Sequence, residues 1–200
     1  PGLPPPTWLQ RLCPRSRLGS ATAAVIFTCA LMWSAVLLGT MGLEHYGWGL
    51  FLGLPFVAGF AAAFIHGAHE PRSLRASLGV ASLAVIVAAL GFVALAIEGI
   101  VCVLMATPLA LPLAMIGALL GHLVAPARWR RGAPEVFCAG VLAVPCMLSA
   151  ERLADAPAPL LEVKSSVEIA APPARVWQHV VAFSELPPPT ELIFRLGIAY

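Results

Sequence analysis

Glu98 is the best candidate in this sequence for an ionisable side chain with a chemical role inside a membrane. It lies between two long apolar runs, 78–97 and 100–124, and only Gly99 separates it from the second run. Ionisable groups are costly within a membrane, and they often mark the path of a proton or an ion. At the turn of a hairpin, however, a carboxylate reaches water at little cost. A plain turn is therefore the simpler interpretation, and a functional Glu98 is the alternative.

The run at 100–124 also contains two prolines and two glycines at helical spacing. Pro108 and Pro112 each remove a backbone hydrogen bond and bend a helix, and broken helices line binding sites in some transporters. Gly117 and Gly121 form a small-xxx-small pattern that lets a neighbouring helix approach closely. We predict helix packing at both glycines. A packing kink at the prolines is favoured over a transport site, because no inverted repeat supports a transporter.

Neither a metal site nor a cofactor is predicted. His66 and His69 are spaced to share one helix face beside Glu70, but no third ligand stands at a matching spacing. Histidines at a helix end more often cap carbonyls or meet lipid headgroups. The five cysteines lack the paired spacing of zinc or redox sites, and we interpret them as small hydrophobic residues. The sequence shows no catalytic triad pattern and no phosphate-binding loop.

The composition indicates the medium that surrounds these residues. Of the 200 residues, 60% are hydrophobic and only 11% are charged, and the mean hydropathy is +0.88. These values lie outside the range of ordinary soluble domains. The net charge of +2 supplies no basic surface for nucleic acid. We therefore predict a polytopic membrane protein whose partner is the lipid bilayer, with no nucleic-acid partner.

Five apolar runs meet or approach the roughly 20 helical residues that cross a bilayer, which predicts a mainly α membrane helix bundle. The predicted spans are residues 20–40, 47–65, 78–97, 100–124 and 136–150. The first span lacks the small-residue exit of a cleaved signal peptide, so we expect it to remain as an anchor. The fifth is shorter than a full span, and a re-entrant or interfacial segment is its alternative.

Arginines collect in the segments that share one face of this bundle. They are Arg11, Arg15, Arg17, Arg72, Arg75, Arg128, Arg130 and Arg131. Because basic residues are enriched in cytoplasmic loops, the N-terminal segment 1–19 is predicted to be cytoplasmic. Contact with anionic lipid is an alternative for the cluster at 128–131, which also contains Trp129. Five spans place the C-terminal segment outside the cell membrane, and four place it in the cytoplasm.

The sequence changes character after the last apolar run. Residues 151–161, ERLADAPAPLL, are polar and rich in Pro and Ala, which is typical of a short, stiff linker. From 161 to 169, apolar and polar side chains alternate as they do in a half-buried strand. Pro172 and Pro173 then favour the start of a helix, and apolar residues recur at helical spacing over 176–183.

The segment VEIAAPPARVWQHVVAFSEL at 167–186 resembles the opening of the START-like superfamily, which includes polyketide cyclases. In that family a first strand ends in an Ala-Pro-Pro turn, and a helix with the Val-Trp pair found here at Val176 and Trp177 follows. The resemblance implies that 162–200 begins an α+β helix-grip domain around an apolar cavity, and that its remaining strands lie beyond Tyr200. Trp177 is its candidate ligand-binding residue, although such an aromatic is more often plain core.

The membrane region is similar to that of bacterial multi-pass proteins that carry such a domain. The similarity lies in YGWGLFLGLPFVAGF at 46–60 and EGIVCVLMATPLALPLA at 98–114. It implies a bacterial inner membrane and no particular activity.

Three functions follow from these patterns. The preferred hypothesis is a membrane anchor for a START-like domain that binds an apolar small molecule or lipid. The alternative is a transporter or channel in which Glu98 and the kinked fourth helix act and the soluble domain regulates. A third is a cyclase-like enzyme, which requires polar residues to converge in the completed pocket.

Overall fold

The computed structural model describes residues 8–44, 46–125, 133–154 and 162–181. Within these ranges the chain forms helices and connections and contains no strand. It divides into two compact units, Pro1–Asp155 and Ala156–Tyr200. The predicted arginine cluster at 128–131 lies outside the described residues.

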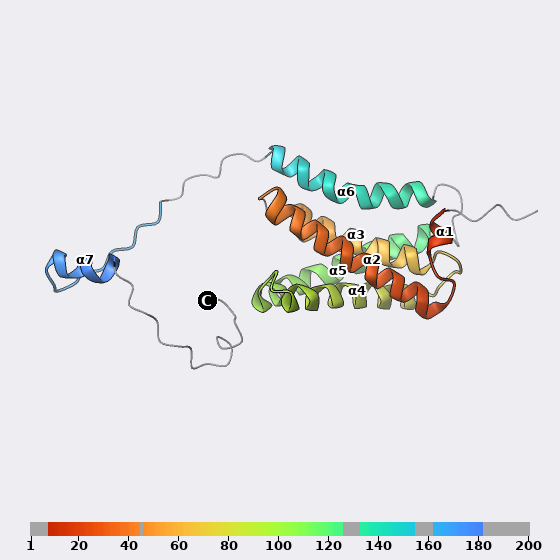
Figure 1. The fold of residues 1–200 in the computed structure, drawn as a ribbon, viewed down its shortest axis with the longest axis horizontal. Helices are drawn as coiled ribbons and strands as arrows, with labels where there is room; N and C mark the ends of the chain where they lie inside the picture. Colours follow the sequence, from red (N-terminus) through yellow and green to blue (C-terminus); the bar gives the residue numbers. More distant parts are fainter. Residues whose placement is uncertain (1–7, 45, 126–132, 155–161, 182–200) are drawn as a thin grey trace, which may run out of the picture. The chain divides into compact units, whose positions relative to one another are not determined.

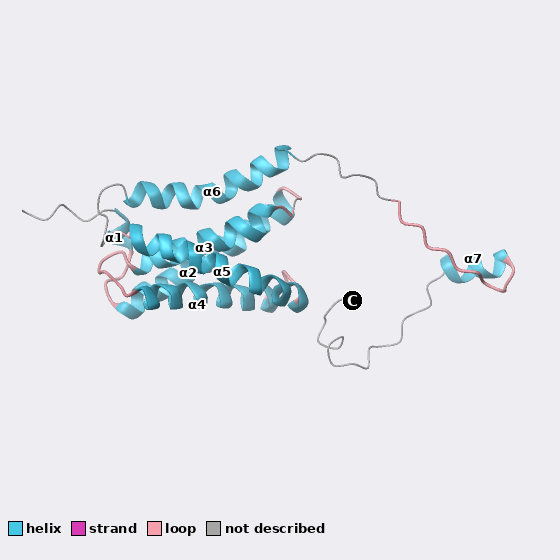
Figure 2. Ribbon diagram, turned by 180° about the vertical axis from the view of Figure 1, so that it is seen from behind, coloured by secondary structure: helices cyan, strands magenta, loops and turns pink. Residues whose placement is uncertain are grey.

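Five segments of the first unit are long and apolar enough to cross a membrane, and this part of the prediction is confirmed. In chain order they are α2 (Arg17–Leu37) with the π-helical η1 (Leu38–Gly42), the π-helical η2 (Gly49–Gly53) with α3 (Leu54–His66), α4 (Leu74–Ala94), α5 (Ile100–Val124) and α6 (Ala133–Ala154). A short helix, α1 (Trp8–Leu12), precedes them. Figures 1 and 2 show the long helices running side by side.

The helix α3 occupies the centre of this unit. It contacts α2, α4, α5 and α6, and all its residues except Phe56 are buried. Many of these residues are Ala or Gly, whose small side chains let neighbouring backbones approach closely. In a membrane, close packing of this kind drives helix association, because lipid gives no hydrophobic driving force between helices. The small residues of α3 therefore allow four helices to gather around it.

The two hairpins α2–α3 and α4–α5 are built alike at the end where they begin. Both open with Pro-Arg-Ser-x-x-x-Ser, at residues 14–20 and 71–77. The first serine of each motif is the N-cap: Ser16 accepts a hydrogen bond from the backbone of Gly19 at 3.0 Å, and Ser73 accepts one from Ala76 at 3.3 Å. An N-cap serine satisfies a backbone N–H that the helix leaves without a partner. The motif therefore fixes where α2 and α4 start.

The second serine of each motif joins the two helices of its hairpin. Ser20 shares a hydrogen bond with Nδ1 of His66 at 3.1 Å, and Ser77 shares one with Nδ1 of His122 at 3.0 Å. All four side chains are buried. The returning helices α3 and α5 are thus tied to the starts of α2 and α4 by equivalent polar pairs.

Several boundaries differ from the predictions. The helix α4 begins at Leu74 because Ser73 caps it, and it ends at Ala94, so its connection to α5 is longer than the two residues that were expected. The fifth helix has 22 residues rather than the short run 136–150, which makes it long enough to span. It includes residues 151–154, so the predicted linker starts too early.

Contacts with α3 and η2 explain the longer fifth helix. Phe137 of α6 stacks on Phe64 of α3 with ring centroids 5.0 Å apart. Both carboxylate oxygens of Glu151 lie 3.0 Å from the backbone nitrogen of Gly49, at the start of η2. A carboxylate is stabilised at a helix N-terminus, so Glu151 can stay within the helical part of the chain instead of ending it.

The second unit contains one described helix, α7 (Pro173–Val181). It begins at Pro173, where the two prolines favour a helix start. Residues 162–169 belong to no helix or strand, so the strand predicted at 161–169 is not formed in the described part of this unit. A strand needs a partner for its backbone N–H and C=O groups, and residues 162–181 supply none. Residues 182–200 lie outside the described ranges.

Candidate functional site

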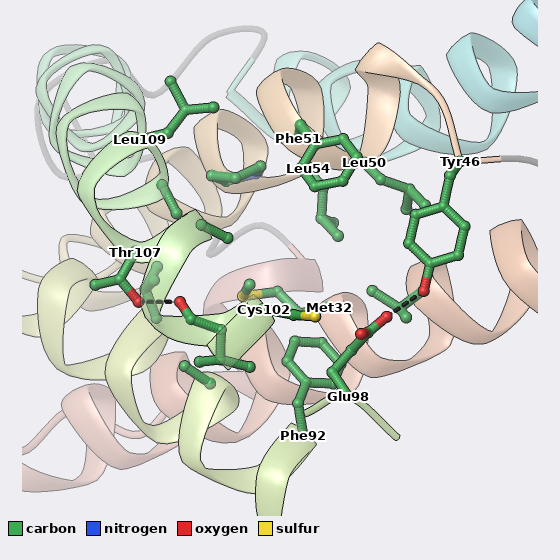
Figure 3. A pocket seen from close by; sticks show the side chains of 17 residues that line it. Met32, Tyr46, Leu50, Phe51, Leu54, Phe92, Glu98, Cys102, Thr107 and Leu109 are labelled. Carbon is green, nitrogen blue, oxygen red and sulfur yellow. Dashed lines mark hydrogen bonds between the residues drawn. The ribbon is translucent and has the colours of Figure 1, made fainter. Parts of the chain in front are cut away.

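A cavity of about 380 Å³ lies among the four helices of the two hairpins. Its volume falls within the range of small-molecule sites in proteins. Figure 3 shows its wall, which is largely apolar and includes Met32, Val36, Leu50, Phe51, Leu54, Val85, Phe92, Val103, Ala106 and Leu109. An apolar ligand can replace lipid against such a wall without loss of hydrogen bonds.

Close packing of glycines limits the cavity to one half of the unit. A Cβ atom at Gly117 would collide with the backbone oxygen of Phe56, and one at Gly121 would collide with that of Phe60. The lining residues of α3 stop at Pro55 and those of α5 stop at Ala110, so the cavity begins where these contacts end. The two glycines that the sequence singled out thus hold α3 and α5 together next to the cavity.

Among the described residues that line the cavity, Glu98 is the only one with a charged side chain. It comes from the α4–α5 connection and is half-buried. Its carboxylate accepts a hydrogen bond from the hydroxyl group of Tyr46, which comes from the connection between η1 and η2. Figure 3 shows the two side chains pointing toward each other at one end of the cavity. The connections of both hairpins therefore meet at this polar pair.

The pair changes the acidity of the phenol. Loss of water around the hydroxyl group, followed by the hydrogen bond to Glu98 and the negative charge of that carboxylate, raises the pKa of Tyr46 from 10.0 to about 12. Although 56% of the side-chain and backbone surface of Tyr46 is exposed, its hydroxyl group faces Glu98 in the cavity. Tyr46 is consequently neutral at physiological pH and acts as a donor.

Backbone conformation at this end of the unit is uncommon. Glu44 has a φ of 50° and Ala96 has a φ of 52°, and each stands two residues before a member of the polar pair. Residues other than glycine rarely adopt this left-handed conformation, which costs of the order of 1 kcal/mol and is concentrated at functional sites. The π-helical turns η1 and η2 flank the first of these connections, and such turns are also frequent at functional sites.

The structure brings together only some of the residues that the sequence singled out. Glu98 lines the cavity, and Pro108 lies in the segment of α5 that forms its wall, between Thr107 and Leu109. The helix α5 continues through both of its prolines. Trp177 lies on α7 in the second unit, where it is 67% exposed and is not among the residues lining the shallow hollow beside that helix.

His66 and His69 have separate partners rather than a common one. His66 is paired with Ser20, and Nε2 of His69 lies 2.7 Å from the backbone oxygen of Cys13. Among the described residues, no group of three or more His, Cys, Asp or Glu side chains could hold a metal ion. The imidazoles thus join helices and connections at the end of the unit opposite to the Tyr46–Glu98 pair.

Tyr46 was not foreseen as part of a site, because its partner is 52 residues away in the sequence. The repeated Pro-Arg-Ser-x-x-x-Ser motif is the signal that could have revealed it. Two hairpins that start alike place their connections at the same end of a bundle, where Tyr46 and Glu98 can meet.

No protein-family model, no curated protein and no solved structure matches this chain.

Proposed function

We propose that this protein is an integral membrane protein that binds an apolar small molecule or lipid within its helical unit. The observation that carries the proposal is the cavity of about 380 Å³ among α2, α3, α4 and α5. It is lined almost wholly by apolar side chains, and it lies in segments that are long and apolar enough to cross a bilayer.

The exposure of two lining residues supports a route from the bilayer. Phe51 of η2 and Leu109 of α5 both line the cavity, yet 42% and 44% of their surfaces are exposed. The wall of the cavity therefore continues onto the outer surface between η2 and α5. Lipid chains cover that surface in a membrane, so an apolar ligand can enter without crossing water.

Cys102 offers a direct test because it lines the cavity and is exposed. In a variant that keeps only this cysteine, reconstituted in lipid nanodiscs, a neutral alcohol such as decanol should slow alkylation of Cys102 by a maleimide, and the effect should saturate. Replacing Ala106 with Phe should fill part of the cavity and slow the same reaction without decanol.

A matched control uses Cys138, which is exposed on α6 and does not line the cavity. In a variant that keeps only Cys138, neither decanol nor Ala106→Phe should change the rate of alkylation. Equal effects of decanol on Cys102 and Cys138 would mean that the alcohol acts on the lipid, and the proposed binding site would then be wrong.

Transport is a second candidate, because Glu98 and the proline-containing part of α5 lie at the same cavity. It predicts that reconstituted vesicles release an entrapped cavity ligand faster than protein-free vesicles and that Glu98→Gln removes the difference. Protection of Cys102 by the ligand without faster release from the vesicles would exclude transport of that ligand. The protein would then be a receptor or a carrier of lipid.

The START-like resemblance of 162–200 leads to a separate proposal for the second unit, namely a further apolar binding site near Trp177. The start of α7 at Pro173 supports it, because that family opens its first helix after an Ala-Pro-Pro turn. The expected result is that part of the binding of an apolar probe survives Ala106→Phe and that this part is lost in Trp177→Ala. Complete loss of probe binding in Ala106→Phe alone would contradict this second site.

A further inference from the structure

We infer that the cavity selects a cationic amphiphile, an apolar chain with an amine or quaternary ammonium head, and that Glu98 is the counter-charge of that head. This inference rests on the proposed binding function and specifies its ligand. It starts from the distribution of charge at the end of the cavity where the two hairpin connections meet.

Among the described residues at this end, carboxylates outnumber basic side chains, because Glu44, Glu98 and Glu151 are accompanied by one arginine, the exposed Arg152 at the end of α6. The connections 43–48 and 95–99 contain Glu44, His45 and Glu98 and no Lys or Arg. Glu151 reaches the same end, but both of its oxygens are engaged by the backbone N–H of Gly49. Among the described residues, no cationic side chain pairs with Glu98.

A half-buried carboxylate without a cationic partner favours a positively charged ligand. In the low-dielectric surroundings of a membrane unit, attraction between opposite charges is much stronger than in water. The hydroxyl group of Tyr46 donates a hydrogen bond to the carboxylate. This hydrogen bond holds the carboxylate in one preferred orientation at the end of the cavity.

Aromatic rings stand beside this carboxylate. The rings of Tyr46 and Phe51 lie with centroids 6.2 Å apart, and Figure 3 shows the ring of Phe92 next to Glu98. All three residues line the cavity. Aromatic faces attract ammonium groups, and quaternary ammonium ions are recognised by aromatic residues in this way. A carboxylate with aromatic neighbours fits an ammonium head, while the apolar wall beyond it fits the chain.

Three probes with the same chain separate the effect of the head from that of the chain. They are decyltrimethylammonium, decanol and decanoate, each measured by protection of Cys102 from alkylation in nanodiscs of zwitterionic lipid. The cation should protect Cys102 at a concentration about tenfold lower than decanol does, because one desolvated charge or cation–π interaction contributes about this difference in affinity. Decanoate should protect Cys102 least.

Two carboxylate variants then assign the effect to a residue. Glu98→Gln should bring the cation to the level of decanol, and the protection by decanol that remains shows that the variant is folded. Glu44→Gln is the matched control, because Glu44 lies in a hairpin connection but does not line the cavity. It should keep the full preference for the cation.

The outcomes distinguish this inference from the function on which it rests. Equal protection by all three probes would overturn the preference for a cation and leave the binding function intact. Protection by none of them would overturn both. A cationic preference that persists in Glu98→Gln would show adsorption elsewhere and would contradict the role of Glu98.

Discussion

At the scale of single residues, Glu98 and Tyr46 form a hydrogen-bonded pair of side chains that joins the two hairpin connections at the cavity. The sequence identified Glu98 as a candidate because ionisable groups are costly within a membrane and often mark the path of a proton or an ion. It did not identify Tyr46, since an aromatic residue near the end of a span is common at the membrane interface. Only the tertiary arrangement turns this interfacial residue into a partner for the carboxylate.

The first prediction concerns the left-handed backbone of Ala96, whose φ is 52°. Glycine adopts this conformation without the steric penalty of a Cβ atom, but it loses more backbone entropy on folding than alanine does. When this entropic cost is subtracted, Ala96→Gly should still raise the free energy of unfolding by roughly 0.5–1 kcal/mol. Thermal unfolding in detergent measures the difference. The control Ala94→Gly, at the helical end of α4, should lower stability by a similar amount. A loss of stability in both variants would contradict the strain at Ala96.

The second prediction concerns the acidity of Tyr46. With Tyr200 replaced by Phe, Tyr46 is the remaining tyrosine, and its tyrosinate absorbance should reach half its final value near pH 12 instead of pH 10. Glu98→Gln should move this midpoint part of the way back, because burial remains the largest cause of the shift.

The sign of the shift determines how stability depends on pH. The folded state favours the neutral phenol of Tyr46. The contribution of this group to the stability of the folded state is therefore complete below pH 10 and is lost as the pH rises through about 12. A midpoint near pH 10 in the folded protein would show that Tyr46 does not donate to Glu98.

At the scale of helices, the apolar runs of the sequence were enough to predict the five helices that are long and apolar enough to cross a membrane. They were not enough to predict where the helices end. The start of α4 depends on the cap at Ser73, and the full length of α6 depends on the contact of Glu151 with Gly49. Two π-helical turns were also not predicted, because no simple residue pattern specifies them. The Pro-Arg-Ser-x-x-x-Ser motif at 14–20 and 71–77 is a direct repeat, so it is not part of the inverted-repeat pattern that is typical of many transporters.

The third prediction concerns the contact between α3 and α5. Gly117→Ala places a methyl group against the backbone oxygen of Phe56, so the two helices must separate. The expected loss is about 1–3 kcal/mol of the free energy of unfolding, together with altered alkylation of Cys102 in the adjoining cavity. Gly79→Ala is the control, because nothing lies within 4 Å of its added Cβ atom. It should be neutral or stabilising, and equal losses in the two variants would contradict the close contact.

The fourth prediction concerns the polar pair that joins α2 to α3. A double-mutant cycle with Ser20→Ala and His66→Ala should give a coupling energy of about 0.6 kcal/mol, and at most about 1.7 kcal/mol, as for other interhelical hydrogen bonds in membranes. Ser34→Ala with His66→Ala is a control cycle, because the hydroxyl group of Ser34 bonds to its own helix at Leu31. Coupling of the same size in both cycles would show that the Ser20–His66 hydrogen bond is not the cause.

At the scale of the whole molecule, the two units were predictable to different extents. The membrane unit carries its own signal, since an apolar run of sufficient length has few alternatives to a spanning helix. The second unit was predicted from alternation and from a family resemblance. Its helix α7 is present, but the strand at 161–169 is not formed in the described residues, because alternation shows which face a strand would bury and does not supply its partner.

The charge pattern also predicts how the membrane unit is oriented. All arginines before α2 and between α3 and α4 lie at the end of the Ser–His pairs, whereas Glu98 and the cavity lie toward the opposite end. From the distribution of basic residues, we expect the first end to face the cytoplasm and the cavity to face outward. An outward cavity would take its ligand from the outer part of the bilayer.

The most direct test of a membrane-spanning unit with an outward cavity is cysteine labelling in intact cells. In a cysteine-free background, Leu95→Cys marks the exposed connection beside Glu98, and Pro71→Cys marks the exposed connection between α3 and α4. A membrane-impermeant maleimide should label Leu95→Cys in intact cells and Pro71→Cys only after lysis. Labelling of both from one side would contradict the crossing of α4, and the reverse pattern would place the cavity at the cytoplasmic face.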